Sequence, residues 1–363
     1  MKSQFMERAL TLAEMARGKT SPNPLVGAVI VKAGKIIAEG FHEKAGTDHA
    51  EIVALKKAKG NAKGSALYVN LEPCCHTGKT GPCTEAIIEA GIKKVVLSMR
   101  DPNPLVSGKG IAALKKAGIT VLEGLLQKEA KLLNAPFEKF ISQKLPYVIM
   151  KAACSLDGRI ASSSGESKWI SNEQSREYVH LLREQSDAIM VGLNTIIRDD
   201  PQLNVRPRKK NGKQPIRIVV DTNLKTPVDA RIFHSLGGKI IVATSSDAPE
   251  SRAKQLEGSG ADILRLPQKE NRVSLKSLMK ELAKREIVTI LLEGGSELYT
   301  DALTQELVDR VAIFYAPIIL GGSDKYTLLQ SKRKSDMTGA LKILNVKKTD
   351  FGDNLLIEGD VGK

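Results

Sequence analysis

Three of the chain's four cysteines lie within eleven residues, PCCHTGKTGPC at positions 73–83, and this cluster most strongly constrains the fold of the first part of the chain. Thiols this close in sequence can form a disulfide, complete a structural metal site or supply part of a catalytic one. The segment HAE, at positions 49–51, adds an imidazole and a carboxylate at the expected start of a helix. One expected strand, ALYVNL, separates the two segments.

The rest of the sequence favours metal binding over a disulfide. The first residues, MKSQFMERALTLAEMARGKT, lack the apolar run of a secretory signal, and no stretch of about 18 apolar residues occurs. We therefore expect a cytoplasmic protein that does not enter a membrane. In a reducing compartment, clustered thiols are better candidates for metal ligation or catalysis than for disulfides.

His49, Cys74 and Cys83 together offer one imidazole nitrogen and two thiolates. Such a set can hold zinc tetrahedrally and leave the fourth position to water. Glu51 then fits a carboxylate that moves protons rather than a fourth ligand, as in the H-x-E and P-C-x-x-C signature of zinc deaminases, although the cysteine spacing here is longer. A structural zinc knot has four protein ligands and needs no carboxylate such as Glu51 beside it. We therefore expect a catalytic zinc.

The net charge of +14 suggests anionic partners, and its distribution favours small ones. Basic residues are scattered apart from RPRKKNGK at 206–213, and only 4% of residues are aromatic, so platforms for stacking bases are scarce. We expect small phosphorylated substrates, and neither nucleic acid nor a membrane surface.

The 363 residues allow two domains, and the pattern changes near position 144. Residues 1–144 alternate helical and strand patterns, with about five strands, and end in one expected connecting helix, QKEAKLLNAPFEKFISQK. Residues 145–363 contain apolar strands such as DAIMVG, IRIVVD and VTILLEGG between helices, which indicates a second α/β domain, mainly parallel with an antiparallel end. That domain has no G-x-G-x-x-G loop, but its LLEGG turn before a helix could hold a phosphate.

The motifs SPNPLVGAVIV, HAE, LEPCCHTGKTGPC and DPNPLVSGKG together resemble the deaminase half of the bifunctional riboflavin-biosynthesis deaminase/reductase family. This resemblance implies a cytidine-deaminase-like α/β/α fold, zinc on His49, Cys74 and Cys83, and proton transfer by Glu51. Position 75 is more often serine in that family, so Cys75 departs from the pattern. The implied contacts to the pyrimidine and the ribose phosphate are Asn23, His42, His76, Lys79 and Asn103.

The motifs MKAACSLDGRIA, GESKWIS, AIMVGLNTIIRDDPQLNVR and LLEGGSEL are similar to the reductase half of the same family, so the resemblance covers nearly the whole chain. It implies a dihydrofolate-reductase-like fold and NADPH. Lys151 and Asp199 are the candidates for proton handling. Implied cofactor contacts are Ala153, Trp169, Thr195, Asp199, Thr222, Gly295, Ser296, Glu297, Leu298, Tyr299, Thr300 and Asp301. Implied substrate contacts are Ser167, Arg183, Leu203, Arg206 and Glu293.

We therefore expect a bifunctional enzyme, deaminase in 1–144 and NADPH-dependent reductase in 145–363, that forms a homo-oligomer. One rival is a nucleoside or tRNA deaminase with an unrelated reductase-like domain, which would turn over cytidine or adenosine. Another is a basic RNA-binding protein with a structural zinc knot, which would bind RNA with steep salt dependence and turn over nothing.

Overall fold

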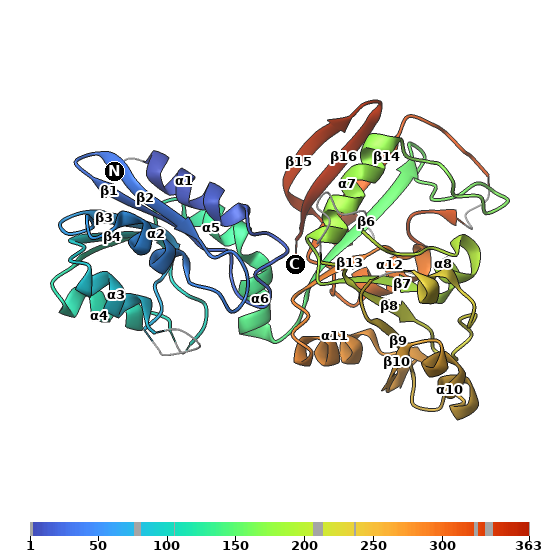
Figure 1. Ribbon diagram of the computed structural model, residues 1–363. Helices are drawn as coiled ribbons and strands as arrows, with labels where there is room; N and C mark the ends of the chain where they lie inside the picture. Colours follow the sequence, from blue (N-terminus) through green and yellow to red (C-terminus); the bar gives the residue numbers. More distant parts are fainter. Residues whose placement is uncertain are drawn as a thin grey trace. The chain divides into compact units, whose positions relative to one another are not determined.

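The computed structural model describes residues 3–75, 81–104, 106–205, 213–235, 237–322, 326–330 and 337–362. The chain divides into two compact units, Met1–Leu145 and Pro146–Lys363 (Figure 1). In the described ranges, no helix combines the length and the apolar character needed to cross a membrane.

The first unit is a five-stranded sheet in the order β2-β1-β3-β4-β5. β1 pairs antiparallel with β2 and β3, and β3, β4 and β5 run parallel. The elements are α1 (Ser3–Glu14), β1 (Gly27–Lys32), β2 (Lys35–Phe41), α2 (Ala50–Ala58), β3 (Ala66–Leu71), α3 (Cys83–Glu89), β4 (Lys94–Met99), α4 (Lys109–Lys116), β5 (Thr120–Glu123), α5 (Gln127–Leu133) and α6 (Ala135–Gln143). The expected α/β order and strand number are confirmed.

Alternate strand residues of this sheet pack on opposite faces. Ala28 and Ile30 of β1 join a core built with α2, α3 and α4, whereas Val29 and Val31 pack against α1. This is the two-residue period of a strand buried on both faces. The sheet therefore forms the middle layer, and α2 and α3 lie on the same side of it, where the predicted metal ligands are carried.

The predicted single helix QKEAKLLNAPFEKFISQK is wrong in one respect, because the structure breaks it at Asn134 into α5 and α6. Pro136 follows the break, and proline cannot donate a helical hydrogen bond. The buried Asn134 side chain turns away to accept from the Leu25 N–H at 2.8 Å and to donate to the Leu25 carbonyl at 2.9 Å. The Leu25 carbonyl also accepts from Asn70, so two amide side chains fix the segment that follows Asn23.

The second unit contains a nine-stranded sheet in the order β10-β9-β8-β7-β13-β6-β14-β16-β15. Its elements are β6 (Tyr147–Ser155), α7 (Glu173–Glu184), β7 (Ala188–Gly192), α8 (Leu193–Asp199), β8 (Ile216–Val220), α9 (Arg231–His234), β9 (Ile240–Ser245), α10 (Glu250–Gly258), β10 (Ala261–Leu266), β11 (Gln268–Lys269), β12 (Arg272–Val273), α11 (Leu275–Lys284), β13 (Thr289–Leu292), α12 (Ser296–Thr304), β14 (Arg310–Ala316), β15 (Ile343–Phe351) and β16 (Asn354–Val361).

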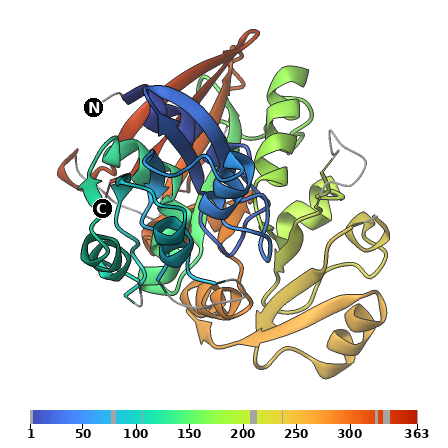
Figure 2. The same ribbon diagram turned by 60° about the vertical axis from the view of Figure 1, so that its left-hand side comes forward.

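This sheet is parallel from β10 to β14 and antiparallel at the end formed by β14, β16 and β15, as predicted. Figure 2 shows β15 and β16 as the long red pair at that end. The central strands β7 and β13 are nearly continuous apolar runs because helices cover both of their faces. Parallel strands bring their carboxyl ends to one edge of the sheet, and Gly192, Asp221 and Glu293 follow or end β7, β8 and β13 there.

Candidate metal centre and reductase cavity

The His49, Cys74 and Cys83 side chains converge in the first unit. Nδ1 of His49 lies 3.2 Å from Sγ of Cys83 and 3.5 Å from Sγ of Cys74. The three ligand atoms all lie within 4.8 Å of one another, and no other such metal-binding group occurs in the described ranges. The four cysteines are free, which rules out the disulfide considered from the sequence.

Two helix starts position these ligands. His49 is the residue before α2 and makes no side-chain cap, so its imidazole is free to turn toward the thiols. Cys83 is the first residue of α3, and its N–H donates to Sγ of Cys74 at 3.4 Å. The backbone N–H groups at a helix start favour negative charge nearby, which suits a thiolate. Hydrogen bonds from Cys83 and His49 lower the pKa of Cys74, so this group is poised to ligate a metal.

Glu51 lies in the first turn of α2 and is almost fully buried. Burial, reinforced by the charge of Cys74, raises its pKa to about 7. A carboxyl group with such a pKa can both accept and release a proton near neutral pH. One imidazole and two thiolates fit zinc and leave a fourth position open, so the donor set matches a catalytic rather than a closed structural site.

The predicted pyrimidine contacts are arranged in two groups. Asn23 Nδ2 lies 3.1 Å from His42 Nε2, and the ring of His42 stands edge-on to His49 with centroids 5.6 Å apart. Asn103 lies in the turn after β4, where its N–H donates to Asp101. That turn is tied to the metal cluster through Glu72, two residues before Cys74. His76 and Lys79 lie outside the described residues.

Glu72 was not singled out from the sequence. Its buried carboxylate accepts from the N–H groups of Asp101, Gly108 and Ile111 at 2.9–3.2 Å, which fastens the turn after β4 and the start of α4 to the cysteine segment. A carboxylate at a helix start is a favourable arrangement. No sequence pattern reveals it, because the partners are main-chain groups about 30 to 40 positions away.

A cavity of about 1330 Å³ in the second unit opens at the carboxyl ends of β7, β8 and β13, the edge where open α/β sheets bind ligands. It brings together most of the predicted reductase residues. Those lining it are Lys151, Ala153, Ser167, Trp169, Arg183, Thr195, Asp199, Leu203, Thr222, Glu293, Gly295, Ser296, Glu297, Leu298, Tyr299 and Asp301. Arg206 lies outside the described residues.

Thr300 does not line this cavity. Its hydroxyl donates to the Ser296 carbonyl, one turn back in α12, and accepts from Gln330 N–H. By contrast, Trp169 is 71% exposed, with the Arg176 guanidinium 4.4 Å from its ring centroid. Trp169 is therefore not the core aromatic residue that its type alone would suggest. Asp199 accepts from the Ser167 hydroxyl at 3.0 Å.

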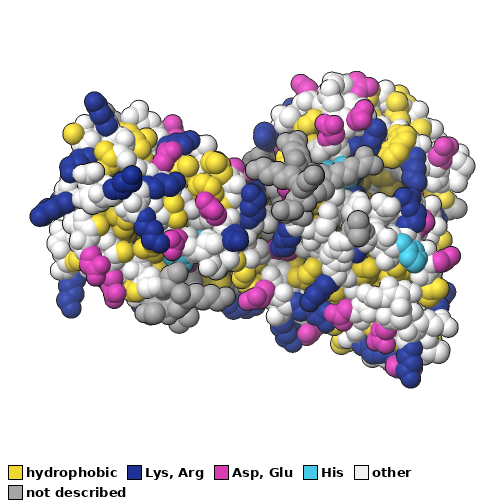
Figure 3. Space-filling model, viewed as in Figure 1, with side chains coloured by type: hydrophobic (Ala, Val, Ile, Leu, Met, Phe, Trp, Pro, Cys, Tyr) yellow, Lys and Arg dark blue, Asp and Glu magenta, His cyan; other side chains and the backbone are white. Residues whose placement is uncertain are grey.

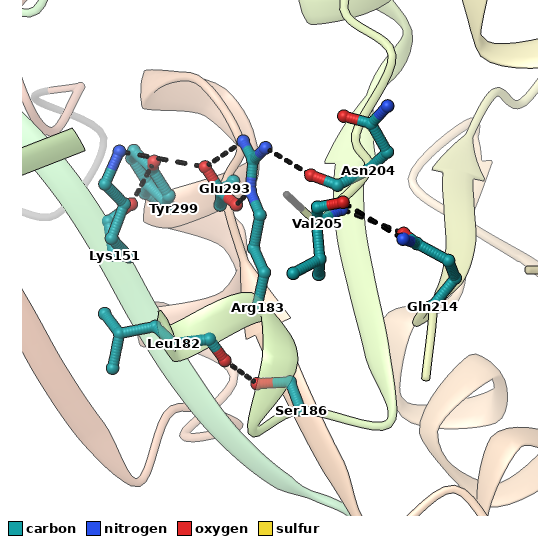
Figure 4. Close-up of polar contacts among 9 residues, drawn as sticks. All are labelled: Lys151, Leu182, Arg183, Ser186, Asn204, Val205, Gln214, Glu293 and Tyr299. Carbon is teal, nitrogen blue, oxygen red and sulfur yellow. Dashed lines mark hydrogen bonds and ion pairs between the residues drawn. The ribbon is translucent and has the colours of Figure 1, made fainter. Parts of the chain in front are cut away.

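The polar centre of the cavity is a buried ion cluster (Figure 4). Arg183 holds Glu293 with two hydrogen bonds, from Nε at 2.6 Å and Nη2 at 3.0 Å, and Lys151 Nζ lies 3.7 Å from Glu293. Burial alone would raise the pKa of Glu293, but the charges of Arg183 and Lys151 outweigh it and lower that pKa to about 2. Tyr299 donates to the Lys151 carbonyl at 2.6 Å, which fixes the strand that carries this lysine.

Sequence reasoning missed His180, which lines the cavity and contributes to the low pKa of Glu293. His180 precedes Arg183 by three positions on α7, so helical spacing could have indicated that both share one face. Gln214, which contacts the segment after α8, was also missed.

The loop between β13 and α12 fits a pyrophosphate. A Cβ added at Gly295 would meet no atom within 4 Å, so it would occupy open space in front of the start of α12. Backbone N–H groups at such a helix start bind phosphate when no side chain stands in the way.

On the face shown in Figure 3, Lys and Arg side chains are interspersed with acidic and apolar ones in each unit. This agrees with the scattered positions of the basic residues in the sequence.

Comparisons with known proteins match a different domain family to each part of the chain. Residues 1–99 match the cytidine and deoxycytidylate deaminase zinc-binding region, and residues 146–356 match the RibD C-terminal domain. The chain is 44% identical over 356 residues to the riboflavin biosynthesis protein RibD of Actinobacillus pleuropneumoniae, covering 98% of this chain and 94% of that protein. The corresponding protein of Aquifex aeolicus is 42% identical, covering 97% and 96%.

Solved structures of similar proteins cover nearly the whole chain. Acinetobacter baumannii RibD has a TM-score of 0.87 at 36% identity, with 99% of each chain covered. The diaminohydroxyphosphoribosylaminopyrimidine deaminase/5-amino-6-(5-phosphoribosylamino)uracil reductase of Thermotoga maritima has a TM-score of 0.85 at 37% identity, covering 99% and 98%. The expected fold class is confirmed, and the chain belongs to the RibD family of bifunctional riboflavin-biosynthesis deaminase/reductases.

Proposed function

We propose that the first unit hydrolytically deaminates 2,5-diamino-6-(5-phosphoribosylamino)pyrimidin-4(3H)-one, and that the second reduces 5-amino-6-(5-phosphoribosylamino)uracil with NADPH. The observation that carries the proposal is the three-ligand cluster of His49, Cys74 and Cys83 with the buried Glu51 beside it. The name of the Thermotoga maritima relative supports this substrate pair.

In the deaminase, His49, Cys74 and Cys83 would hold zinc, which supplies Lewis-acid activation of a water molecule. Glu51 takes a proton from this water and delivers it to the departing amino group of the pyrimidine. Its raised pKa suits both steps, because it can be deprotonated before attack and protonated before release. Asn23 and Asn103 are the proposed contacts to the ring and the ribose phosphate.

In the reductase, the residues from Gly295 to Asp301 would hold NADPH, which would supply the hydride for the sugar C1. The chain positions the substrate through Arg183, whose guanidinium has five N–H groups. Three of them donate to Glu293 and to the Asn204 carbonyl. The two that remain, one on each terminal nitrogen, have no partner among the described residues and suit a phosphate. Lys151 is the proposed proton donor, because burial lowers its pKa and it lies inside the cavity.

The test is incubation of the zinc-loaded protein with the diaminopyrimidine phosphate, with and without NADPH. Without NADPH, ammonia and the uracil phosphate should accumulate, and addition of NADPH should convert the uracil compound into its ribityl form with loss of absorbance at about 340 nm. Turnover of cytidine or adenosine in its place, or binding of RNA without turnover, would overturn the proposal.

We also propose that the chain is cytoplasmic and self-associates. Its four free cysteines suit a reducing compartment. β15 is the edge strand of the large sheet, with Leu344 51% and Val346 49% exposed, and a second copy would shield this edge from water. Light scattering should give a mass of at least twice the 39.3 kDa of one chain.

A further inference from the structure

The side chain of Gln214 makes a two-point contact with the main chain of Val205, nine positions earlier. Gln214 Oε1 accepts from the Val205 N–H at 2.9 Å, and Gln214 Nε2 donates to the Val205 carbonyl at 3.0 Å. The amide thus satisfies both backbone groups of a buried residue, as a neighbouring strand would. Figure 4 shows the paired contacts beside the ion cluster.

The residues held by this contact form a short segment, 202–205, that reaches the reductase cavity. Gln202, Leu203 and Asn204 line the cavity, and Leu203 has φ of +49°, a conformation that a leucine keeps only when its surroundings impose it. The Asn204 carbonyl accepts from Arg183 Nη1 at 3.1 Å. A continuous chain of contacts therefore runs from Gln214 through the segment to the Arg183 guanidinium.

This chain decides which way Arg183 presents its remaining N–H groups. Glu293 fixes one edge of the guanidinium through Nε and Nη2, and the Asn204 carbonyl fixes the Nη1 side. A guanidinium restrained on two sides presents its other donors in one direction, which lowers the cost of ordering it around a phosphate. If segment 202–205 shifts, the second restraint is lost.

We propose that Gln214 is a positioning residue for the phosphate of the reductase substrate, acting through Val205 and Asn204 on Arg183. The inference rests on the proposed reductase activity and adds a residue and a role to it. Gln214 itself does not line the cavity, so its effect has to be transmitted through the main chain.

Gln214 lies far from a predicted cofactor contact, so its substitution should affect substrate binding and not cofactor binding. Gln214 precedes β8 (Ile216–Val220), whereas Thr222, a predicted cofactor contact, follows the opposite end of the same strand. Five strand residues span about 17 Å. Loss of the Gln214 contact should therefore weaken substrate binding while leaving the affinity for NADPH unchanged.

The test compares Gln214→Ala and Gln214→Glu with the wild type. Glu keeps an acceptor for the Val205 N–H but places a second acceptor against the Val205 carbonyl, so it breaks one half of the contact. Both variants should raise the KM for the uracil phosphate by about tenfold, with kcat changed less than about threefold. Gln268→Ala is the matched control, because Gln268 is an exposed glutamine of the same unit that donates to Asp247, and neither residue lines the cavity.

Four further readouts keep the outcome decisive. NADPH affinity and deamination should match the wild type, which shows that the variant chain is folded. The increases in KM caused by Gln214→Ala and Arg183→Lys should fail to multiply in the double variant, since Gln214 acts only through the guanidinium that Arg183→Lys removes. Binding of ribose 5-phosphate, followed by calorimetry, should weaken by a similar factor.

An unchanged KM in either Gln214 variant, or losses that multiply in the double variant, would overturn the inference. Equal losses of NADPH and substrate affinity would also overturn it, since they would indicate a general effect on the fold. A wild-type protein that does not reduce the uracil phosphate would refute the proposed function instead. Ribose 5-phosphate binding would then still decide whether Gln214 orders an anion site.

Discussion

Asn23 Nδ2 lies 3.1 Å from His42 Nε2, and the opposite nitrogen of the same ring, Nδ1, lies 3.0 Å from the main-chain carbonyl of Asp48. A carbonyl only accepts, so Nδ1 carries the proton and Nε2 of the neutral ring accepts. Burial lowers the pKa of His42, which favours that neutral form. Asn23 must then donate with its NH₂ group, which leaves its carbonyl oxygen for the contact that we propose with an N–H of the pyrimidine.

His42→Phe should therefore impair deamination through Asn23. Phenylalanine fills the buried space but offers no acceptor, so the Asn23 amide loses its fixed orientation. The KM for the diaminopyrimidine phosphate should rise about tenfold, the scale of one buried hydrogen bond. Zinc content should stay at the wild-type level. In steady-state kinetics, His42→Phe combined with Asn23→Ala should be little worse than Asn23→Ala alone, and multiplied losses would show that the two residues act separately.

The metal ligands can be tested by comparing two cysteines of the same segment, Cys83 and Cys75. Cys83→Ser removes a thiolate from the three-ligand cluster and should lower the zinc content of the purified protein sharply, because metal affinity depends on the full donor set. Cys75→Ser is the matched control, since Cys75 is outside the cluster, and should retain about one zinc per chain. Elemental analysis measures both, and full zinc in Cys83→Ser would assign the ligand to another group.

Glu51→Gln separates proton transfer from metal binding. Glutamine has a similar shape but cannot take a proton from water, so deamination should fall by about 10²-fold or more while zinc remains bound. Ammonia release and zinc content give the two readouts. Reduction of separately supplied uracil phosphate should continue at the wild-type rate, and loss of that activity would contradict independent sites.

Gly295→Val tests the loop before α12 as the pyrophosphate site. Gly295 has φ of −95°, which valine adopts readily, and its Cβ would meet open space, so the substitution should not disturb folding. The side chain would stand between the helix start and an anion, and the dissociation constant for NADPH should rise about tenfold or more. Gly258→Val, at an equally open glycine of α10, should bind NADPH normally in a fluorescence titration. If Gly295→Val and Gly258→Val bind NADPH with equal affinity, the pyrophosphate of the cofactor does not bind at the loop before α12.

Glu293 should make the second unit sensitive to acid. Its pKa is lowered from 4.5 to about 2, so its stabilising effect is present above pH 4.5 and is lost as the pH falls toward 2. A shift of this size corresponds to about 3 kcal/mol. Glu293→Gln should therefore have the lower free energy of unfolding at neutral pH, and the difference from the wild type should shrink below pH 4.5. Urea unfolding followed by Trp169, the only tryptophan, reports on this unit.

The sequence predicted those features that depend on local spacing. The apolar runs of β7 and β13 indicated buried parallel strands, and the order of His49, Glu51, Cys74 and Cys83 indicated an open zinc site. The break at Asn134 was missed although Pro136 is a sequence signal for a helix start there. The contact that fixes the break could not be predicted, because the Asn134 side chain bonds a backbone 109 positions away. The contacts of Gln214 and Glu72 were not predicted either, because their partners are main-chain groups. A main-chain partner leaves no pattern of residue types in the sequence. All the substrate and cofactor contacts, those of His76, Lys79 and Arg206 included, stay predictions.

The buried amide of Asn134 also decides how the deaminase could be obtained as a separate fragment. The zinc-binding-region match ends at residue 99, and the sheet is complete at Glu123, so a shorter fragment would retain every predicted metal ligand. It would nevertheless strip the Leu25 N–H of its partner at the turn leading out of Asn23. A fragment that keeps the segment after Asn23 in place should therefore run to Leu145, where the first unit ends.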